Sequence, residues 1–486
     1  MKRALILFTI LELFFCASTQ AVSYADFLVD VIVTYQETDP LLPWQKTTPL
    51  GRHGYGTVIK NGHILTTESL VRNHTLIEIR RPGRGKKLKV SPLQIDSQAN
   101  LAILAPPEDR MTRGLSPVPL ASAVSLKDAV RIIQTDENGK VQIGNGKVIQ
   151  VAVKQLPSST SQMLSCILLT DLNVGGAGAP VILEDGSLAG LMISYNSSSR
   201  TGDMLPCQVL SHFVEDAVNP PYRGFASAGF IWSPLINPAK RRLLNVPDEE
   251  SGILVLACIP GTGAAESLKP NDVILEWNGF AVDSLGYYKD PHFGRLAFSY
   301  LIKGRAEPGD AVSLRIVRDR ESMDLDISLS RLLDTDALIP ENITGSQPEH
   351  LVEGGFVLRE LTGRYLRSHG RRWQYALDSR LVHMYLTRRY SPDRPGDRIV
   401  ILSRVLPDRV NVGYQDTRNV PVRRVNGRKV RNMKDVFRIR GRDGHIERIG
   451  LQSMSVDLVL NARLLEEANE RIARIYGLRS LVHRHE

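Results

Sequence analysis

Residues 175–180, which read GGAGAP, constrain the fold of this chain more than any other segment. The glycines allow the backbone to turn sharply between two strand-like runs, so the segment predicts a strand–turn–strand unit. A glycine-rich turn of this kind can point backbone N–H groups toward an oxyanion, while a nucleophile between the glycines attacks a carbonyl. In this chain the residue between the glycines is Ala177. Its methyl group cannot attack a carbonyl.

The region around this turn has the pattern of an all-β domain. From residue 22 to about residue 217, short β-branched runs alternate with Gly, Asn and Asp turns, which indicates two barrels. Residues 219–223 (NPPYR) then break the pattern as a linker. At about 100–200 residues per domain, the chain is long enough for about three domains.

Three segments of this region resemble the catalytic segments of the HtrA/Deg family of trypsin-like serine proteases. They are GYGTVI with ILTTESLV at residues 54–71, DSQANLAIL at 96–104, and TDLNVGGAGAP at 170–180. The resemblance places Ser69, Asn100 and Ala177 at the positions of the general base, the orienting aspartate and the nucleophile. It also implies a remnant oxyanion loop made of three glycines, Gly175, Gly176 and Gly178.

All three roles of the triad are therefore lost while the surrounding scaffold is kept, which is typical of a pseudoenzyme. An alignment slip is the alternative, but the flanking segments keep the expected order. We expect no rescue by another histidine. His63 lies six residues before Ser69 on a strand-like run, up to roughly 20 Å away in an extended chain. His53 and His74 stand in polar, turn-like contexts.

The N-terminus has the pattern of a secretory signal over residues 1–21. Lys2 and Arg3 precede an apolar run, and small residues follow it. Glu12 interrupts the run, which argues against a membrane anchor. No later stretch reaches the roughly 20 apolar residues of a membrane span. We therefore expect an exported soluble protein, secreted or periplasmic.

Three cysteines follow the signal: Cys166, Cys207 and Cys258. Cys166 and Cys207 both fall in the second barrel, so a disulfide between them is one alternative in an oxidising compartment. The odd number and the apolar contexts favour buried free thiols instead. Neither the cysteines nor the histidines have metal-ligand spacing. We expect no metal and no cofactor.

The formal net charge is +9, and the excess is concentrated in the last third of the chain. A nucleic-acid partner is disfavoured because the chain is expected to be exported and the basic runs lack interleaved stacking aromatics. A solvated basic face is the simplest interpretation. An anionic envelope surface or an acidic partner is the alternative.

Residues 224–335 resemble a PDZ domain of the HtrA/Deg type. SAGFI at 227–231 resembles the loop that holds a peptide carboxylate, and LKPNDVILEWNG at 268–279 matches the family pattern over its length. The apolar spacing of residues 295–302 predicts a helical wall for the groove. The resemblance implies strand addition by a peptide C-terminus, with packing between domains as the alternative use. The expected contacts are Ala228, Gly229, Phe230, Ile231, Leu296 and Tyr300.

A weaker repeat of this unit occupies residues 351–457. Residues 354–357 (GGFV) echo residues 228–231, and an Asn-Gly pair recurs at the corresponding place further on. This predicts a second, divergent PDZ-like domain. The tail, residues 458–486, contains an amphipathic helix at 461–476 by its apolar spacing. The C-terminal half resembles the plant and fungal Deg branch.

These features predict a mainly-β chain with a trypsin-like double β-barrel over residues 22–218, two PDZ-like (α+β) domains and a C-terminal helix. The expected function is that of an inactive HtrA/Deg homologue that binds peptide C-termini or unfolded polypeptides. The resemblance implies a homo-oligomer, trimer-based, or co-assembly with an active relative. The alternatives are an active serine endopeptidase and an envelope-binding structural protein.

Overall fold

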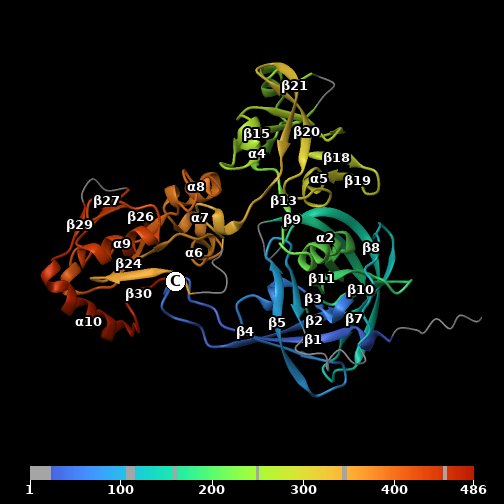
Figure 1. The fold of residues 1–486 in the computed structure, drawn as a ribbon, viewed down its shortest axis with the longest axis horizontal. Coiled ribbons are helices and arrows are strands. Elements are labelled where there is room, and N and C mark those ends of the chain that lie inside the picture. The colour runs from blue at the N-terminus through green and yellow to red at the C-terminus, as the bar shows by residue number, and fades with distance from the viewer. Residues whose placement is uncertain are drawn as a thin grey trace, which may run out of the picture.

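The computed structural model describes residues 23–105, 115–156, 161–247, 251–341, 347–452 and 457–485. The signal expected at residues 1–21 lies outside this part of the chain. Two barrels, drawn in blue to green, lie together in Figure 1. A yellow-green unit stands above them, and the orange-to-red C-terminal unit lies to one side.

The first barrel is closed by six antiparallel strands in the order β1-β2-β3-β6-β5-β4. They are β1 (Leu28–Tyr35), β2 (Leu50–Val58), β3 (Ile64–Thr66), β4 (His74–Arg80), β5 (Lys87–Asp96) and β6 (Leu101–Ala105), with α1 (Glu68–Val71) after β3. Alternate residues of β1, Val29, Val31 and Val33, are fully buried, as expected for a strand with one face on a core. A turn at Asn61 and Gly62 connects β2 to β3 with φ values of 65° and 73°.

The second barrel closes in the order β10-β11-β12-β9-β8-β7. Its strands are β7 (Ala129–Thr135), β8 (Val141–Gln155), β9 (Gln162–Thr170), β10 (Pro180–Leu183), β11 (Leu188–Asn196) and β12 (Thr201–Pro206). Helix α2 (Cys207–Val218) follows β12 and ends before the expected linker. The glycine turn at 175–180 leads directly into β10, so the predicted strand–turn–strand unit is confirmed.

The third unit is a sheet in the order β14-β15-β16-β20-β21, with β17 beside β16. Its elements are β13 (Ala226–Ser227), β14 (Phe230–Pro234), α3 (Pro238–Leu243), β15 (Ile253–Cys258), α4 (Gly263–Ser267), β16 (Val273–Trp277), β17 (Phe280–Ala281), β18 (Tyr287–Asp290), β19 (Gly294–Ala297), α5 (Ser299–Lys303), β20 (Ala311–Arg318), β21 (Glu321–Ser328) and β22 (Ser330–Arg331). The prediction of a helix over residues 295–302 is wrong for the first half of this range. Residues 294–297 form a hairpin with β18 instead, and only α5 is helical.

The C-terminal unit is a sheet in the order β29-β28-β26-β25-β24-β23-β30, with β27 beside β26. Its strands are β23 (His350–Glu353), β24 (Phe356–Glu360), β25 (Val400–Val405), β26 (Val420–Val425), β27 (Arg428–Lys429), β28 (Arg448–Leu451), β29 (Leu458–Val459) and β30 (Val482–His483). Its helices are α6 (Gly363–Arg367), α7 (Trp373–Ala376), α8 (Ser379–Arg388), α9 (Met433–Asp443) and α10 (Leu465–Tyr476). Short 3-10 turns occur at η1 (Tyr24–Asp26), η2 (Lys60–Gly62), η3 (Asp334–Asp336), η4 (Arg409–Asn411) and η5 (Ala462–Leu464).

The expected C-terminal helix is present as α10, but it belongs to the core of this last unit. Ala468 and Ile472 are fully buried against Val352 and Val357 of the sheet. The chain then returns as β30, which pairs antiparallel with β23. The segment expected to be a tail therefore completes the sheet.

The apolar cores show how the four bodies are joined. One continuous cluster of buried apolar residues runs through both barrels and the third unit. The C-terminal unit has its own clusters, and the barrel-side segment between β1 and β2 contributes Leu41 and Trp44 to them. This segment is thus the junction between the first barrel and the C-terminal unit.

Candidate functional site: the degenerate triad and the peptide groove

The structure brings Ser69 and Asn100 together, as the resemblance implied. Ser69 lies in α1, directly after β3, and Asn100 lies in the turn before β6. The Ser69 backbone N–H donates to the side-chain oxygen Oδ1 of Asn100 at 2.8 Å. Asn100 is buried and has a φ of 56°, which Asn tolerates better than most residues. Its amide therefore binds the backbone of the position where a base is expected.

Ala177 lies close to the same helix, across Gly54 of β2. The Tyr55 backbone N–H donates to the Ala177 carbonyl at 2.9 Å. A Cβ added to Gly54 would lie 2.5 Å from that carbonyl oxygen and 2.8 Å from the Leu70 side chain in α1. Glycine at this place lets the turn and the helix approach each other. The three expected triad positions thus lie around Gly54, in the middle of β2.

The glycine turn is held by backbone contacts that require its glycines. Gly178 has a φ of 84°, and a Cβ there would lie 2.2 Å from the Tyr55 carbonyl oxygen. Its N–H donates to the Met192 carbonyl at 2.8 Å. A Cβ on Gly176 would lie 3.1 Å from the Cα of Gly54. Ala179 fits a fully buried place beside the turn. The conformation of the turn is therefore fixed by these contacts, even though the turn carries no nucleophile.

One donor of the remnant oxyanion loop is already used within the chain. The Gly175 backbone N–H donates to Oε1 of Gln134 at 2.9 Å. The Gln134 Nε2 donates in turn to the Asn173 carbonyl at 3.1 Å, and the side chain is buried. An oxyanion would have to displace this amide to reach Gly175. Gln134 comes from β7, far from the turn in sequence, so no local pattern predicts the contact.

The structure shows where the three histidines considered as substitute bases lie and what two of them contact. His53 Nε2 lies 3.5 Å from the buried carboxylate of Asp30. Burial raises the pKa of Asp30, but hydrogen bonds from His53, Thr135 and Arg80 outweigh it and hold the pKa below its ordinary value. His74 Nδ1 lies 2.9 Å from the Val71 carbonyl. His63 precedes β3, at the opposite end of that strand from α1.

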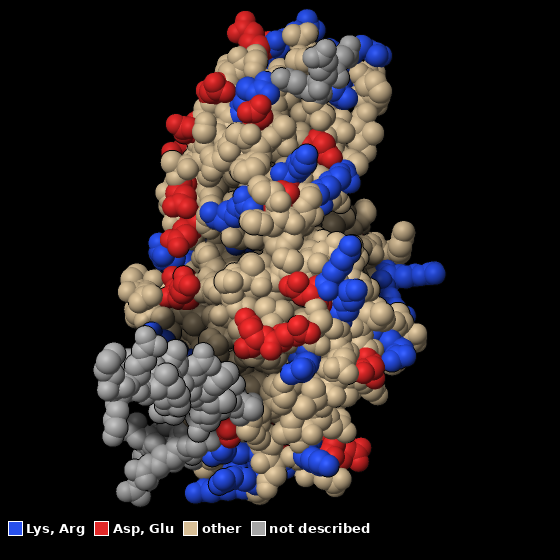
Figure 2. Space-filling view, turned by 90° about the vertical axis from the view of Figure 1, so that its right-hand side faces the viewer, with Lys and Arg blue, Asp and Glu red and all other residues tan. Residues whose placement is uncertain are grey.

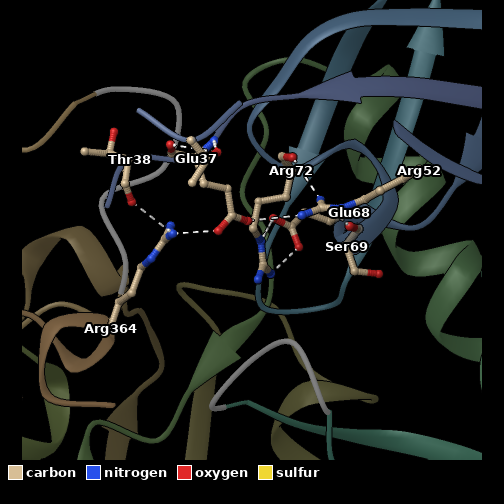
Figure 3. A network of polar contacts seen from close by, with 8 residues as sticks. Glu37, Thr38, Arg52, Glu68, Ser69, Arg72 and Arg364 are labelled. Carbon is tan, nitrogen blue, oxygen red and sulfur yellow. Dashed lines mark hydrogen bonds and ion pairs between the residues drawn. The ribbon is translucent and has the colours of Figure 1, made fainter. Parts of the chain in front are cut away.

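Figure 3 shows how the backbone of Ser69 is connected to the C-terminal unit. The Arg52 guanidinium donates to the carbonyls of Ser69 and Arg72, both at 3.1 Å. It also donates to Glu37 at 3.1 Å. Arg364 in α6 donates to the other carboxylate oxygen of Glu37 at 2.7 Å. The end of α1 is therefore fixed by a chain of charged contacts that crosses the junction.

The residues of the predicted peptide site lie in β14 and in the loop before it, and in β19 and α5. β14 is an edge strand of the sheet, so its outer side is open to strand addition. Ala228 and Gly229 precede it, and Ile231 lies within it. Gly229 has a φ of 75°, and a Cβ there would lie 2.4 Å from the Thr262 hydroxyl oxygen.

The three apolar side chains predicted to line this groove are buried in the unit instead. Phe230 is 7% exposed and packs beside Trp277 with ring centroids 6.2 Å apart. Leu296 lies in β19, not on a helix, and is 1% exposed. Tyr300 lies in α5 and is also buried. These three side chains belong to the core of the unit, so the edge of β14 and the loop before it carry the candidate site.

The corresponding loop of the C-terminal unit is closed by the chain itself. The Gly354 backbone N–H donates to Oδ1 of Asn469, from α10, at 2.7 Å. The Gly354 carbonyl accepts from the Asn411 side chain at 2.7 Å. Both groups are buried. The loop of the repeat recognised in the sequence is present, but its Gly354 N–H binds Asn469 and so holds α10.

The cysteines are free thiols, as favoured from the sequence. Cys166 and Cys207 are buried, and Cys258 is half-buried. Burial raises the pKa of Cys166 to about 12 and that of Cys207 to about 11, so neither forms a nucleophilic thiolate at neutral pH. No group of three or more His, Cys, Asp or Glu within the described ranges could hold a metal ion.

On the face seen in Figure 2, charged residues of the two signs are mixed. Figure 2 shows Lys and Arg interspersed with Asp and Glu over the described residues of this face. In the part of the chain that the structure describes, no helix is long and apolar enough to cross a membrane.

Comparison with known proteins identifies the class of protein that this fold and site define. Residues 54–191 match the model of a trypsin-like peptidase domain, and residues 339–482 match that of a PDZ domain. The PDZ match covers the repeat that looked weaker in the sequence, together with α10 and part of β30. The protein therefore combines a trypsin-like peptidase fold with PDZ modules.

Full-length relatives carry the identification further. The chain is 29% identical over 417 residues to Protease Do-like 2, chloroplastic, of Arabidopsis thaliana, covering 85% of this chain and 67% of the relative. It is 25% identical over 464 residues to Protease Do-like 4, mitochondrial, of the same organism, covering 93% and 84%. A variant of the HtrA-type protease AlgW, solved with a decapeptide, superposes with a TM-score of 0.51 at 18% identity, covering 63% of this chain and 94% of that chain. Over most of its length, the chain is therefore similar to Do-like proteases of the HtrA/Deg family.

Proposed function

We propose that this chain is a catalytically inactive member of its family that binds polypeptides without cleaving them. The observation that carries the proposal is Ala177 in the glycine turn, at the place where a serine would have to attack. Ser69 and Asn100 occupy the two supporting positions. The Gly175 N–H is used by Gln134, so stabilisation of an oxyanion is also impaired.

Peptide binding is supported by the edge of β14 and the Gly229 loop before it. An added strand gains main-chain hydrogen bonds along β14, and backbone N–H groups of the loop can hold the terminal carboxylate. The relatives are named as proteases, and one solved relative was obtained with a decapeptide. We infer from them that extended peptides are the ligand class here as well.

We also propose a setting for this function. Export by the N-terminal signal would place the protein among secreted or periplasmic proteins, as an adaptor or holding chaperone in protein quality control. We propose assembly into a trimer-based homo-oligomer or with an active relative. Light scattering of the purified chain, alone and mixed with such a relative, distinguishes the two assemblies.

The proposal is tested by incubating the chain with a library of C-terminal peptides. Calorimetry measures binding, and mass spectrometry of the recovered peptides measures cleavage. We expect saturable binding with every recovered peptide intact. Cleaved peptides, with cleavage abolished by a serine-directed inhibitor, would show an active endopeptidase instead.

A further inference from the structure

A basic cavity lies at the junction between the first barrel and the C-terminal unit. It has a volume of about 130 Å³ and is lined from both sides. The first barrel contributes residues of the 36–46 and 73–75 segments, including Lys46, and the C-terminal unit contributes residues 347–348 and residues of the 359–365 segment, including Arg359 and Arg364. A water needs about 10–15 Å³ in this measure, so the cavity has room for a small polyatomic ion and some water. None of the described residues that line it is Asp or Glu.

Arg359 is the key group in this cavity. It lies in β24, is only 2% exposed, and donates from Nη1 to the Pro40 carbonyl at 2.5 Å. Among the described residues, its buried Nε has no hydrogen-bond partner. A buried guanidinium carries a fixed fork of five donors, and leaving one of them unpaired costs free energy. Its remaining contact is the Tyr365 ring, 4.8 Å from the guanidinium carbon.

The nearby acids do not neutralise this cation. Glu37 is bound by Arg52 and Arg364. Asp39 influences Arg359 electrostatically, but its carboxylate accepts the backbone N–H groups of Leu41 and Leu42. Burial without a contacting carboxylate lowers the pKa of Arg359 to about 10. The site thus holds a desolvated cation without a counterion.

Lys46 adds a second positive charge from the opposite side. It is exposed, lines the cavity, and makes no ion pair within the described ranges. Two further buried polar atoms without a partner, Nε1 of Trp44 and Nε2 of His350, come from the same junction. The ring centroids of these two residues are 6.1 Å apart. Unsatisfied polar groups therefore concentrate where the two bodies meet.

We propose that this cavity is a binding site for a small oxyanion of the phosphate or carboxylate kind. The Arg359 guanidinium provides a buried positive charge and charge-assisted donors at the cavity wall, and Lys46 provides a second charge. The bound anion contacts the 36–46 segment and the C-terminal unit at once. It therefore acts as a ligand that joins the first barrel to that unit, independently of any peptide bound along β14.

The test uses the full chain and follows thermal unfolding and calorimetric binding. Inorganic phosphate and acetate are titrated separately, with sodium chloride keeping the ionic strength constant. Because a ligand that binds only the folded state raises Tm with its concentration, we expect a saturable rise with at least one of the two anions. The anion with the lower Kd identifies the class as phosphate or carboxylate.

Three variants assign the effect to the cavity. Arg359→Met is expected to raise the Kd at least about tenfold, because it removes the only buried charged donor. Lys46→Gln, at an exposed position that does not endanger folding, is expected to raise it about threefold. Lys60→Gln changes an exposed lysine outside the cavity and serves as the matched control. Absence of saturable binding, or equal Kd values for Lys46→Gln and Lys60→Gln, would overturn the proposal.

Discussion

An orienting aspartate accepts a hydrogen bond and also stabilises a protonated imidazole. The Asn100 side chain can perform the first of these tasks but not the second. Its Oδ1 still accepts the Ser69 backbone N–H, which fixes the start of α1. A neutral amide cannot stabilise a protonated imidazole, and Ser69 provides no imidazole to stabilise. The contact that remains is structural. The contact therefore holds the scaffold at this place without any catalytic role for Asn100.

A serine restored at residue 177 alone is therefore expected to remain inactive. Ala177→Ser supplies a hydroxyl, but residue 69, where the resemblance places the base, is a serine and cannot take up its proton. Hydrolysis of a fluorogenic peptide should stay at the level of the buffer. The triple change Ser69→His, Asn100→Asp and Ala177→Ser is the matched comparison, in which activity becomes chemically possible. Hydrolysis by the single variant would show that the base is another residue.

The steric demand on the glycine turn can be separated from backbone strain. Gly178→Ala combines a φ of 84° with a Cβ 2.2 Å from the Tyr55 carbonyl oxygen. Gly186→Ala is the control, because its φ of 87° is similar and nothing lies within 4 Å of the added Cβ. We expect a loss of about 1 kcal/mol for Gly186→Ala and more than about 3 kcal/mol for Gly178→Ala. Urea unfolding measures both, and equal losses would contradict the packing described.

At this scale, the resemblance assigned three residues to the triad positions, and the structure brings these residues together, but the sequence did not predict the contacts around them. Ser69, Asn100 and Ala177 were found because neighbouring segments carry recognisable glycines and strands. Gln134 was missed, because it reaches Gly175 from a strand 41 residues away. Its contact depends on how the second barrel closes, and single-sequence patterns contain no such information.

At the level of elements, the edge of β14 gives a direct prediction for peptide binding. Peptides with a free C-terminal carboxylate should bind more tightly than the same peptides with an amidated C-terminus, because the Gly229 loop can hold an anion. Calorimetry on matched pairs measures the difference, expected at about tenfold or more. Equal affinities would leave only strand addition by internal segments. Substituting Gly229 is a poor test, since a Cβ there would collide with Thr262.

Pairing of β23 with β30 makes the C-terminal unit sensitive to acid. Burial lowers the pKa of His350 to about 4, from an ordinary value of 6.5, with the neighbouring His483 and Arg359 acting in the same direction. Between these two values the unfolded chain binds more protons than the folded one, so stability falls as the pH falls from 6.5 to 4.

His350→Leu should therefore flatten the dependence of unfolding free energy on pH in that window. The wild-type loss attributable to His350 is about 2 to 3 kcal/mol. The exposed His383→Gln serves as the control. Urea unfolding at a series of pH values measures the slope, and an unchanged slope for His350→Leu would contradict the burial described.

Two elements show where sequence patterns fail. The spacing of residues 295–302 satisfies a helix, yet the turn after β18 brings residues 294–297 back as its antiparallel partner. The tail was correctly predicted to contain a helix, but its return as β30 depends on a partner more than a hundred residues away. The periodicity of apolar residues indicates which secondary structure a segment prefers locally. Pairing with distant strands then decides which secondary structure the segment adopts.

Across the whole molecule, the C-terminal unit is attached through the segment between β1 and β2. Leu41 and Trp44 pack into its apolar clusters, and Glu37 accepts from Arg364. The order of barrels and PDZ-like units was predictable, because each carries its own motif. Their contacts were not, because the junction residues follow no motif. The basic residues of the last third are partly explained by this junction, where Arg359 and Arg364 lie.

The most direct test of inactivity is the hydrolysis of unfolded casein by the purified wild-type chain. An active HtrA-type protease serves as the positive control, and labelling by a fluorophosphonate is followed in parallel. Since residue 177 is alanine and no base stands at residue 69, we predict no turnover above the buffer and no labelling. Turnover of casein together with covalent labelling of the chain would contradict the account.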